Sequence, residues 1–215
     1  MKTRLACLLL TLTALATAPA PASAQVGAGL LDPNVATKEQ LAELPGLSDT
    51  IVEALVEARP FADATTFDTF LAKHTLDEEA RDAVYARAFV HVNLQTADSK
   101  TFQLIPGVGD HMAHEFDEYR PWKSWKQFDK EIGKYVEDEE VARLKQYLFI
   151  PLDLNTASEA DFKTIPGVGK HMAHEFEEYR PWKSKAQFER EIGKYVDEKE
   201  VARLWRYVVI VVEES

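Results

Sequence analysis

A short glycine motif that occurs three times is the feature that most constrains the fold of this 215-residue chain. Successive copies are offset by 61 and 60 residues, as Gly46, Gly107 and Gly167 show. A repeat at this period predicts three tandem structural units of about sixty residues each. The copies read Leu44-Pro45-Gly46-Leu47-Ser48-Asp49, Ile105-Pro106-Gly107-Val108-Gly109-Asp110 and Ile165-Pro166-Gly167-Val168-Gly169-Lys170.

The second and third units are near copies, since residues 105–150 and 165–210 differ at 13 of 46 aligned positions. The first unit has diverged much further. In the third unit, Met172, Phe176 and Tyr179 recur at helical spacing after the motif. Pro181 ends that helix, because the residue before a proline avoids the helical region.

Polar residues three apart mark where the other helices of the third unit start, because such pairs cap a helix reciprocally. We therefore expect each unit to be a compact block of four to five helices and the protein to be all-α. The pairs are Thr156 with Glu159, Ser184 with Gln187, and Asp197 with Glu200.

The motif itself predicts a tight turn between two helices. Pro166 cannot continue the preceding helix, and Gly167 and Gly169 permit positive φ and close approach of another molecule to the backbone. The first N–H groups of the next helix then point outward at the positive end of its dipole. Such an end favours a phosphate, although the same pattern also fits a turn that binds no ligand.

Together with Leu154-Asn155-Thr156-Ala157, this motif resembles the helix-hairpin-helix family, in particular the DNA-binding domain of the bacterial competence receptor ComEA. The resemblance covers nearly all of the chain after residue 24, about three times over. It implies paired hairpins that hold the phosphate backbone of double-stranded DNA through main-chain N–H groups, without reading sequence. The extrinsic photosystem II subunit of cyanobacteria resembles the same domain and serves a protein assembly, so a protein partner stays open.

The resemblance assigns DNA contacts to the hairpins of the second and third units. The third unit is the better candidate, because Lys170 follows its glycines directly, whereas Asp110 at the same place in the second unit repels phosphate. The first unit replaces the second glycine with Ser48 and adds Asp49. The expected contact residues are Gly107, Val108, Gly109, Gly167, Val168, Gly169, Lys170 and His171.

Charge argues in the other direction. The chain has 25 basic and 36 acidic side chains and a formal net charge of −11, whereas nucleic-acid binders normally carry a basic excess. All three units are acidic: residues 32–92 hold 5 basic and 12 acidic side chains, 93–152 hold 8 and 11, and 153–215 hold 10 and 13. Acidity favours the alternative, a protein–protein or scaffold module that has lost DNA binding.

The first 24 residues have the pattern of a secretory signal peptide, with Lys2 and Arg4 before a short apolar run and Ala22-Ser23-Ala24 as a small-x-small cleavage site. We therefore expect cleavage after Ala24 and a periplasmic or extracellular location. The only cysteine, Cys7, lies in this leader, so no disulfide is expected. No later segment has the length and apolar character of a membrane span.

Catalytic signatures are absent from the sequence: it has no Gly-x-Ser-x-Gly, no P-loop and no thiol after the leader. We therefore expect a non-catalytic protein without a cofactor. His171, His174 and Glu178 share one helix face, and His111, His114 and Glu118 repeat the pattern. Such faces can hold zinc or nickel, but no third strong ligand is evident nearby, and we assign no metal.

The expected organisation is a signal peptide at 1–24, a linker at 25–31, and blocks at 32–92, 93–152 and 153–215. The joints at 89–93 and 149–153 are short and apolar, which predicts rigid connections and a rod or arc of blocks. The β-prone tail at 208–212 either covers the last block, which we favour, or presents an edge to a partner.

Overall fold

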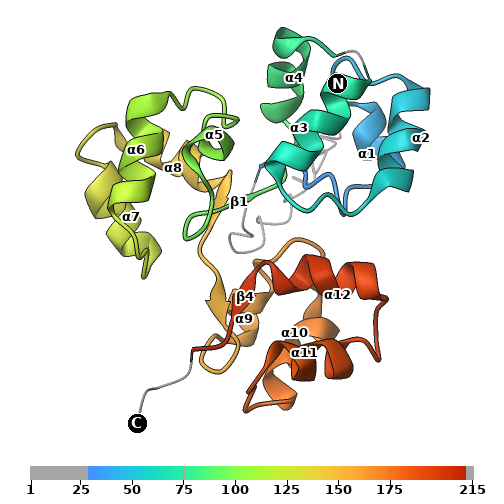
Figure 1. Cartoon of the computed structure of the whole chain (residues 1–215), viewed down its shortest axis with the longest axis vertical. Coiled ribbons are helices and arrows are strands. Elements are labelled where there is room, and N and C mark those ends of the chain that lie inside the picture. The colour runs from blue at the N-terminus through green and yellow to red at the C-terminus, as the bar shows by residue number, and fades with distance from the viewer. Residues whose placement is uncertain (1–28, 75, 212–215) are drawn as a thin grey trace, which may run out of the picture.

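The computed structural model describes residues 29–74 and 76–211. Within them, twelve helices are joined by turns and by strands of two residues (Figure 1). The expectation of a mainly helical protein is confirmed, whereas the short strands were not expected. The predicted signal peptide and most of the linker lie outside the described residues. No described helix is long and apolar enough to cross a membrane.

Four helices fall within each of the three expected ranges, which we call blocks 1, 2 and 3. In block 1 they are α1 Lys38–Ala42, α2 Asp49–Ala58, α3 Ala64–Lys73 and α4 Glu78–Tyr85. In block 2 they are α5 Ser99–Phe102, α6 Asp110–Glu118, α7 Trp125–Ile132 and α8 Asp138–Lys145. In block 3 they are α9 Glu159–Phe162, α10 Lys170–Glu178, α11 Lys185–Ile192 and α12 Glu198–Trp205.

The helix starts follow local capping chemistry, with one departure from the sequence expectation. Ser184 and Asp197 cap α11 and α12 as predicted. Thr156 does not cap α9; Ser158 does, in a capping box with Asp161. Thr156 is instead held in the preceding turn, where its hydroxyl donates to Asp153 Oδ2 at 2.8 Å.

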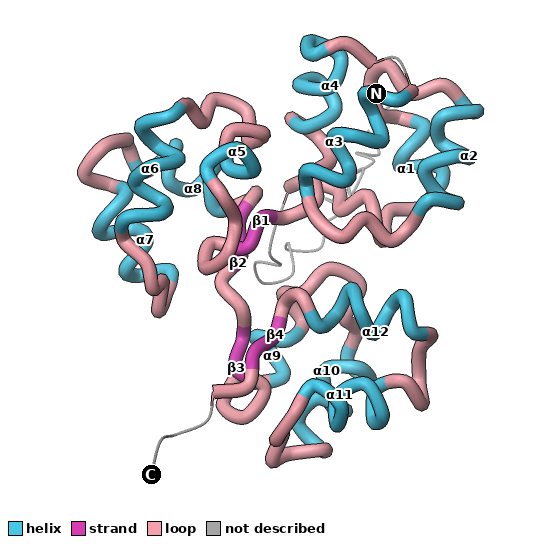
Figure 2. Tube along the Cα trace, in the orientation of Figure 1, coloured by secondary structure: helices cyan, strands magenta, loops and turns pink. Residues whose placement is uncertain are grey.

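Short parallel strand pairs close the blocks (Figure 2). In block 3, β3 Leu152–Asp153 pairs with β4 Val208–Val209. At the start of block 2, β1 Val92–Asn93 pairs with β2 Leu148–Phe149, and a single bridge joins Leu31 to Ala88 in block 1. Each pair joins the residues before a block's first helix to those after its last. The first residues of the β-prone tail therefore cover the last block, as favoured.

The apolar core is continuous between blocks 1 and 2 but separate in block 3. Phe89 is fully buried in the shared core and packs edge to face on Tyr147, with ring centroids 5.2 Å apart. Phe149 joins the core of block 3 and stacks on Tyr207 at 4.5 Å. Block 3 is therefore attached through less apolar contact than block 2.

The blocks form three lobes around a common centre, not the expected rod or arc (Figure 1). Block 3 turns back onto block 1, where the Tyr207 hydroxyl donates to Asp32 Oδ2 at 3.1 Å. Arg206 Nη2 donates to the carbonyl oxygen of His91 at 3.1 Å. These long-range polar contacts hold block 3 against block 1 in a closed arrangement.

Candidate anion-binding hairpins

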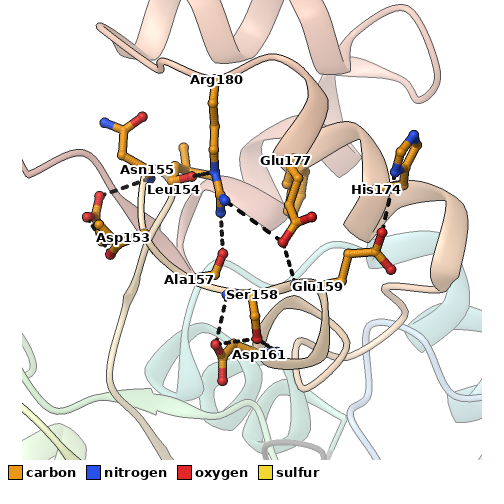
Figure 3. A network of polar contacts seen from close by, with 12 residues as sticks. Asp153, Leu154, Asn155, Ala157, Ser158, Glu159, Asp161, His174, Glu177 and Arg180 are labelled. Carbon is orange, nitrogen blue, oxygen red and sulfur yellow. Dashed lines mark hydrogen bonds and ion pairs between the residues drawn. The ribbon is translucent and has the colours of Figure 1, made fainter.

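An arginine ties together the two helices of each hairpin at the end away from the glycine turn. In block 3, Arg180 Nε donates to the carbonyl oxygen of Leu154 at 2.6 Å, and its Nη2 donates to that of Ala157 (Figure 3). Glu177 beside it accepts the backbone N–H of Glu159 at 2.8 Å. These bonds fix the start of α9 against the end of α10, so the hairpin between them is a braced unit.

Arg120 and Arg59 make equivalent bonds in the other blocks. Arg120 Nε donates to Leu94 O at 2.6 Å, and Arg59 Nη2 donates to Ala36 O at 2.7 Å. The bond to the alanine before the N-cap of the first helix is therefore common to all three repeats, but Arg59 lacks the second bond because its Nε is buried without a partner among the described residues.

The first glycine of each motif is needed for the turn. Gly46, Gly107 and Gly167 have φ of 75°, 82° and 79°, which favours glycine over residues with a Cβ. The next residue has its N–H used within the turn: those of Val108 and Val168 donate to Ile105 O and Ile165 O. The side chains of both valines are buried. Val108 and Val168 therefore shape the hairpin but offer no free donor to a ligand.

The second glycine leaves amide groups free. Gly109 and Gly169 are the N-caps of α6 and α10 and provide no side-chain cap. Within the described part of the chain, the N–H groups of Gly169, Lys170 and His171 have no hydrogen-bond acceptor, and neither do their block 2 counterparts. In block 1 the N–H groups of Ser48, Asp49 and Thr50 likewise have no acceptor among the described residues. The difference lies one residue later, where Ser48 Oγ accepts the N–H of Ile51 at 3.4 Å and thereby stands at the start of the helix.

Folding does not require glycine at this second position. Gly169 has φ −87° and ψ 178°, an extended conformation open to any residue, and Gly109 is similar. A Cβ atom added at either position would meet nothing within 4 Å. Ser48 occupies the same backbone position in block 1 with φ −75° and ψ 161°. The helices α6 and α10 thus lack a side-chain cap at a position where a capping residue would fit.

An arginine from the last helix of the block lies beside the first glycine, and the sequence analysis missed it. Arg143 Nη2 lies 3.3 Å from the position that a Cβ of Gly107 would take, and Arg203 Nη2 lies 3.2 Å from that of Gly167. The sequence signal was a Gly-to-Arg spacing of 36 residues in both units. In block 1 a Cβ on Gly46 would meet Ala80 and Leu76 and no described cation within 4 Å; Arg87 donates instead to the carbonyl oxygen of Glu43 at 2.7 Å.

A glutamate one helical turn earlier holds each arginine. Arg143 makes two 2.7 Å hydrogen bonds to Glu140, and Arg203 makes the same two bonds to Glu200. The bonds from Arg143 lower the pKa of the Glu140 carboxyl, despite an opposing effect of burial. A bound phosphate would therefore meet an arginine that is already oriented but partly neutralised.

The flanks of the two hairpins differ in charge. Lys170 is exposed at the start of α10, and Lys163 across the turn pairs with Glu159 at 3.3 Å. At the equivalent places in block 2, Gln103 donates to Asp110 at 2.7 Å. Local charge therefore favours an anion at the block 3 hairpin, as the sequence suggested.

The exposed histidines next to the hairpins contact acidic and aromatic neighbours. His171 Nδ1 lies 3.7 Å from Glu175 Oε1, and its ring packs on Tyr195 at 5.4 Å. His174 lies 3.3 Å from Glu159 and 3.4 Å from Glu178. No group of three or more acidic, histidine or cysteine side chains among residues 29–74 and 76–211 is placed to hold a metal ion.

A comparison with known proteins found no match: no protein-family model, curated protein or solved structure matches the chain.

Proposed function

We propose that this chain is an exported, non-catalytic helix-hairpin-helix protein that binds duplex DNA without sequence preference. The hairpins of blocks 2 and 3 contact phosphates through the free N–H groups at the starts of α6 and α10. Arg143, Arg203 and Lys170 supply positive charge beside those groups. Block 1 makes no such contact, because Ser48 caps its helix and no arginine lies beside Gly46.

The main support for this proposal is the presence of glycine at positions 109 and 169. Their backbone conformation is ordinary and the space around them is empty, so neither the turn nor the packing accounts for them. Close approach of a ligand to the main chain does account for them, because a Cβ would stand between the ligand and the amides. A helix N-terminus with free N–H groups matches a phosphate oxygen in both charge and hydrogen bonding.

The acidic surface limits the strength of this binding. With a net charge of −11, the protein repels DNA at long range, so the affinity depends on a few local contacts. We expect weak binding that falls steeply between about 50 and about 200 mM salt, as expected where phosphate contacts dominate.

A protein-binding scaffold is the second candidate, favoured by that same charge and by the block 2 hairpin. There Asp110 lies at the helix N-terminus, where its carboxylate accepts a hydrogen bond from Gln103 and interacts favourably with the helix dipole. In this alternative the hairpins serve only to pack the blocks.

The test is to give both hairpins the side chain that block 1 already carries. In the Gly109→Ser, Gly169→Ser double variant each serine caps its helix as Ser48 does, which leaves the fold intact and stabilises each helix by roughly 0.3 kcal/mol. Titration of a labelled duplex at low salt, followed by fluorescence anisotropy, should show at least about a tenfold loss of affinity, or about 1.4 kcal/mol.

Ser48→Gly is the matched control and should leave DNA affinity unchanged. The proposal fails if the wild-type protein does not bind duplex DNA at low salt, or if the double variant binds as well as the wild type. Either result leaves the scaffold function in its place.

A further inference from the structure

Blocks 2 and 3 are near copies, so each serves as an internal reference for the other. Their hairpin arginines have the same local partners but different exposure: the side chain of Arg143 is 32% exposed and that of Arg203 is 1% exposed. The hairpin prolines follow the same trend, with Pro106 half-buried and Pro166 buried. Residues that do not belong to block 3 therefore cover one side of its hairpin.

The covering residues belong to the segment that precedes α1 in block 1. A Cβ atom on Gly167 would lie 2.9 Å from Val35 Cγ1, whereas one on Gly107 would meet only Arg143. Asp32, three residues before Val35, is close enough to Arg203 for their charges to interact. Val35 and Asp32 thus lie against the hairpin that carries Lys170.

Buried polar contacts hold block 1 in this position. Asp32 is 5% exposed and accepts a hydrogen bond from the Tyr207 hydroxyl at 3.1 Å. His91 Nδ1 lies 3.4 Å from Asp32 Oδ2, and Arg206 donates to the carbonyl oxygen of His91. The bonds of Tyr207 to Asp32 and of Arg206 to His91 join block 3 to block 1, whereas the contact between His91 and Asp32 lies within block 1.

The same cluster is incompletely satisfied. Neither ring nitrogen of His91 has a well-aligned hydrogen bond, and Nη1 of Arg203 and Nη1 of Arg206 are buried without a partner. Buried polar groups without partners are costly. Because the apolar core of block 3 is also separate from that of blocks 1 and 2, little apolar burial opposes separation here.

We propose that block 1 is an autoinhibitory cap on one side of the block 3 hairpin, and that separation of blocks 1 and 3 frees Arg203 to bind a DNA phosphate. This inference rests on the proposed DNA-binding function. In the closed form Gly169, Lys170 and His171 are exposed, whereas Arg203 is not. Opening adds this arginine to the contact.

The test uses the full chain with Asp32→Asn combined with Tyr207→Phe. The asparagine can still accept the N–H of Asn34, which Asp32 Oδ1 accepts at 2.8 Å, so the local turn survives while the contact with block 3 is lost. Tyr85→Phe is the control, because it removes a tyrosine–aspartate bond, to Asp68, that lies within block 1. Small-angle scattering should show a larger radius of gyration only for the double variant.

Duplex affinity should rise in the open variant by up to about tenfold, the ratio expected if about one wild-type molecule in ten is open. Adding Gly169→Ser should abolish that gain. Val35→Gln, at a 39% exposed position, provides a second way to displace the cap and should act in the same direction.

The outcomes distinguish a failure of the autoinhibition from a failure of the proposed DNA binding. If scattering shows opening but affinity stays at the wild-type value, the cap does not inhibit binding and the inference is wrong. If none of the variants opens, the polar cluster does not hold block 1 in place, which also overturns it. If neither the closed nor the open protein binds DNA, the proposed function fails, and the autoinhibition fails with it.

Discussion

The hydroxyl of Tyr207 lies 3.1 Å from Oδ2 of Asp32, although 175 residues separate the two in sequence. Both side chains are buried. This bond joins the last block to the residues that precede the first helix, and it closes the chain of blocks. The contact between block 3 and block 1 therefore includes a titratable carboxyl group.

The first prediction concerns acid. Burial raises the pKa of Asp32, but contact with His91 and Asn34 and the charge of Arg203 outweigh burial, and the net pKa lies below its ordinary value of 3.8. A carboxyl with a lowered pKa stabilises the closed form above its ordinary pKa, and that contribution is lost as the pH falls through the lowered value. Scattering should therefore show closed molecules at neutral pH and opening below about pH 4.

The charged and titratable groups that interact with Asp32 are His91, Arg203, Arg59 and Tyr207. Asp32→Asn should remove the acid-dependent step while leaving any acid unfolding of the blocks in place. Opening at the same pH in wild type and variant would show that another of these groups controls the contact.

The second prediction reverses the charge at equivalent positions of the two hairpins. Lys170→Asp gives block 3 the residue found in block 2 and should weaken duplex binding by roughly 1–2 kcal/mol, the scale of a hydrogen bond to a charged group. Asp110→Lys should strengthen binding at the accessible block 2 hairpin. Anisotropy titrations in which both substitutions shift affinity the same way would contradict the phosphate model.

The third prediction concerns Arg143, which is the exposed member of the arginine pair. Arg143→Gln should weaken duplex binding by roughly 1–2 kcal/mol and reduce the salt slope by about one phosphate contact. Lys73→Gln removes one positive charge from block 1, at the end of α3, and should change neither quantity. Equal effects from both would mean that only net charge matters.

The fourth prediction concerns stability. Arg180→Lys removes the planar group that bonds two carbonyl oxygens at the start of α9, and a lysine ammonium cannot reproduce that geometry. Denaturant unfolding should show a loss of roughly 1–3 kcal/mol. Arg190→Lys, at a side chain that is 65% exposed, should stay within about 0.5 kcal/mol. Similar losses from both would rule out the brace.

Local features were predictable from the sequence because short-range chemistry determines them. Positive φ at Gly167 and the caps at Ser184 and Asp197 follow from residues within a few positions of one another. Thr156 was misassigned because Asp153, three residues before it, competes for its hydroxyl. Sequence spacing alone does not show which polar partner prevails.

Contacts between distant residues were not predictable in the same way. Arg203 lies beside Gly167 because of the position of α12 relative to the hairpin. Val35 lies beside Gly167 because block 3 contacts block 1. The repeated 36-residue spacing marks the two arginines but does not show that they lie beside the glycines, and nothing in the sequence indicates the approach of Val35. The second arginine, Arg143, could have been found from the repeated 36-residue spacing, but its exposure could not.

The pairing of β3 with β4, and of β1 with β2, has a consequence for how such a chain changes in evolution. His91 and Pro151 precede equivalent points of the repeat: residues 92–151 contain both β1 and β2, and the residues from 152 onward contain both β3 and β4. Duplication or loss of the segment between these points adds or removes four helices together with a complete strand pair. The number of blocks can therefore change by whole repeats without an intermediate that leaves a strand unpaired.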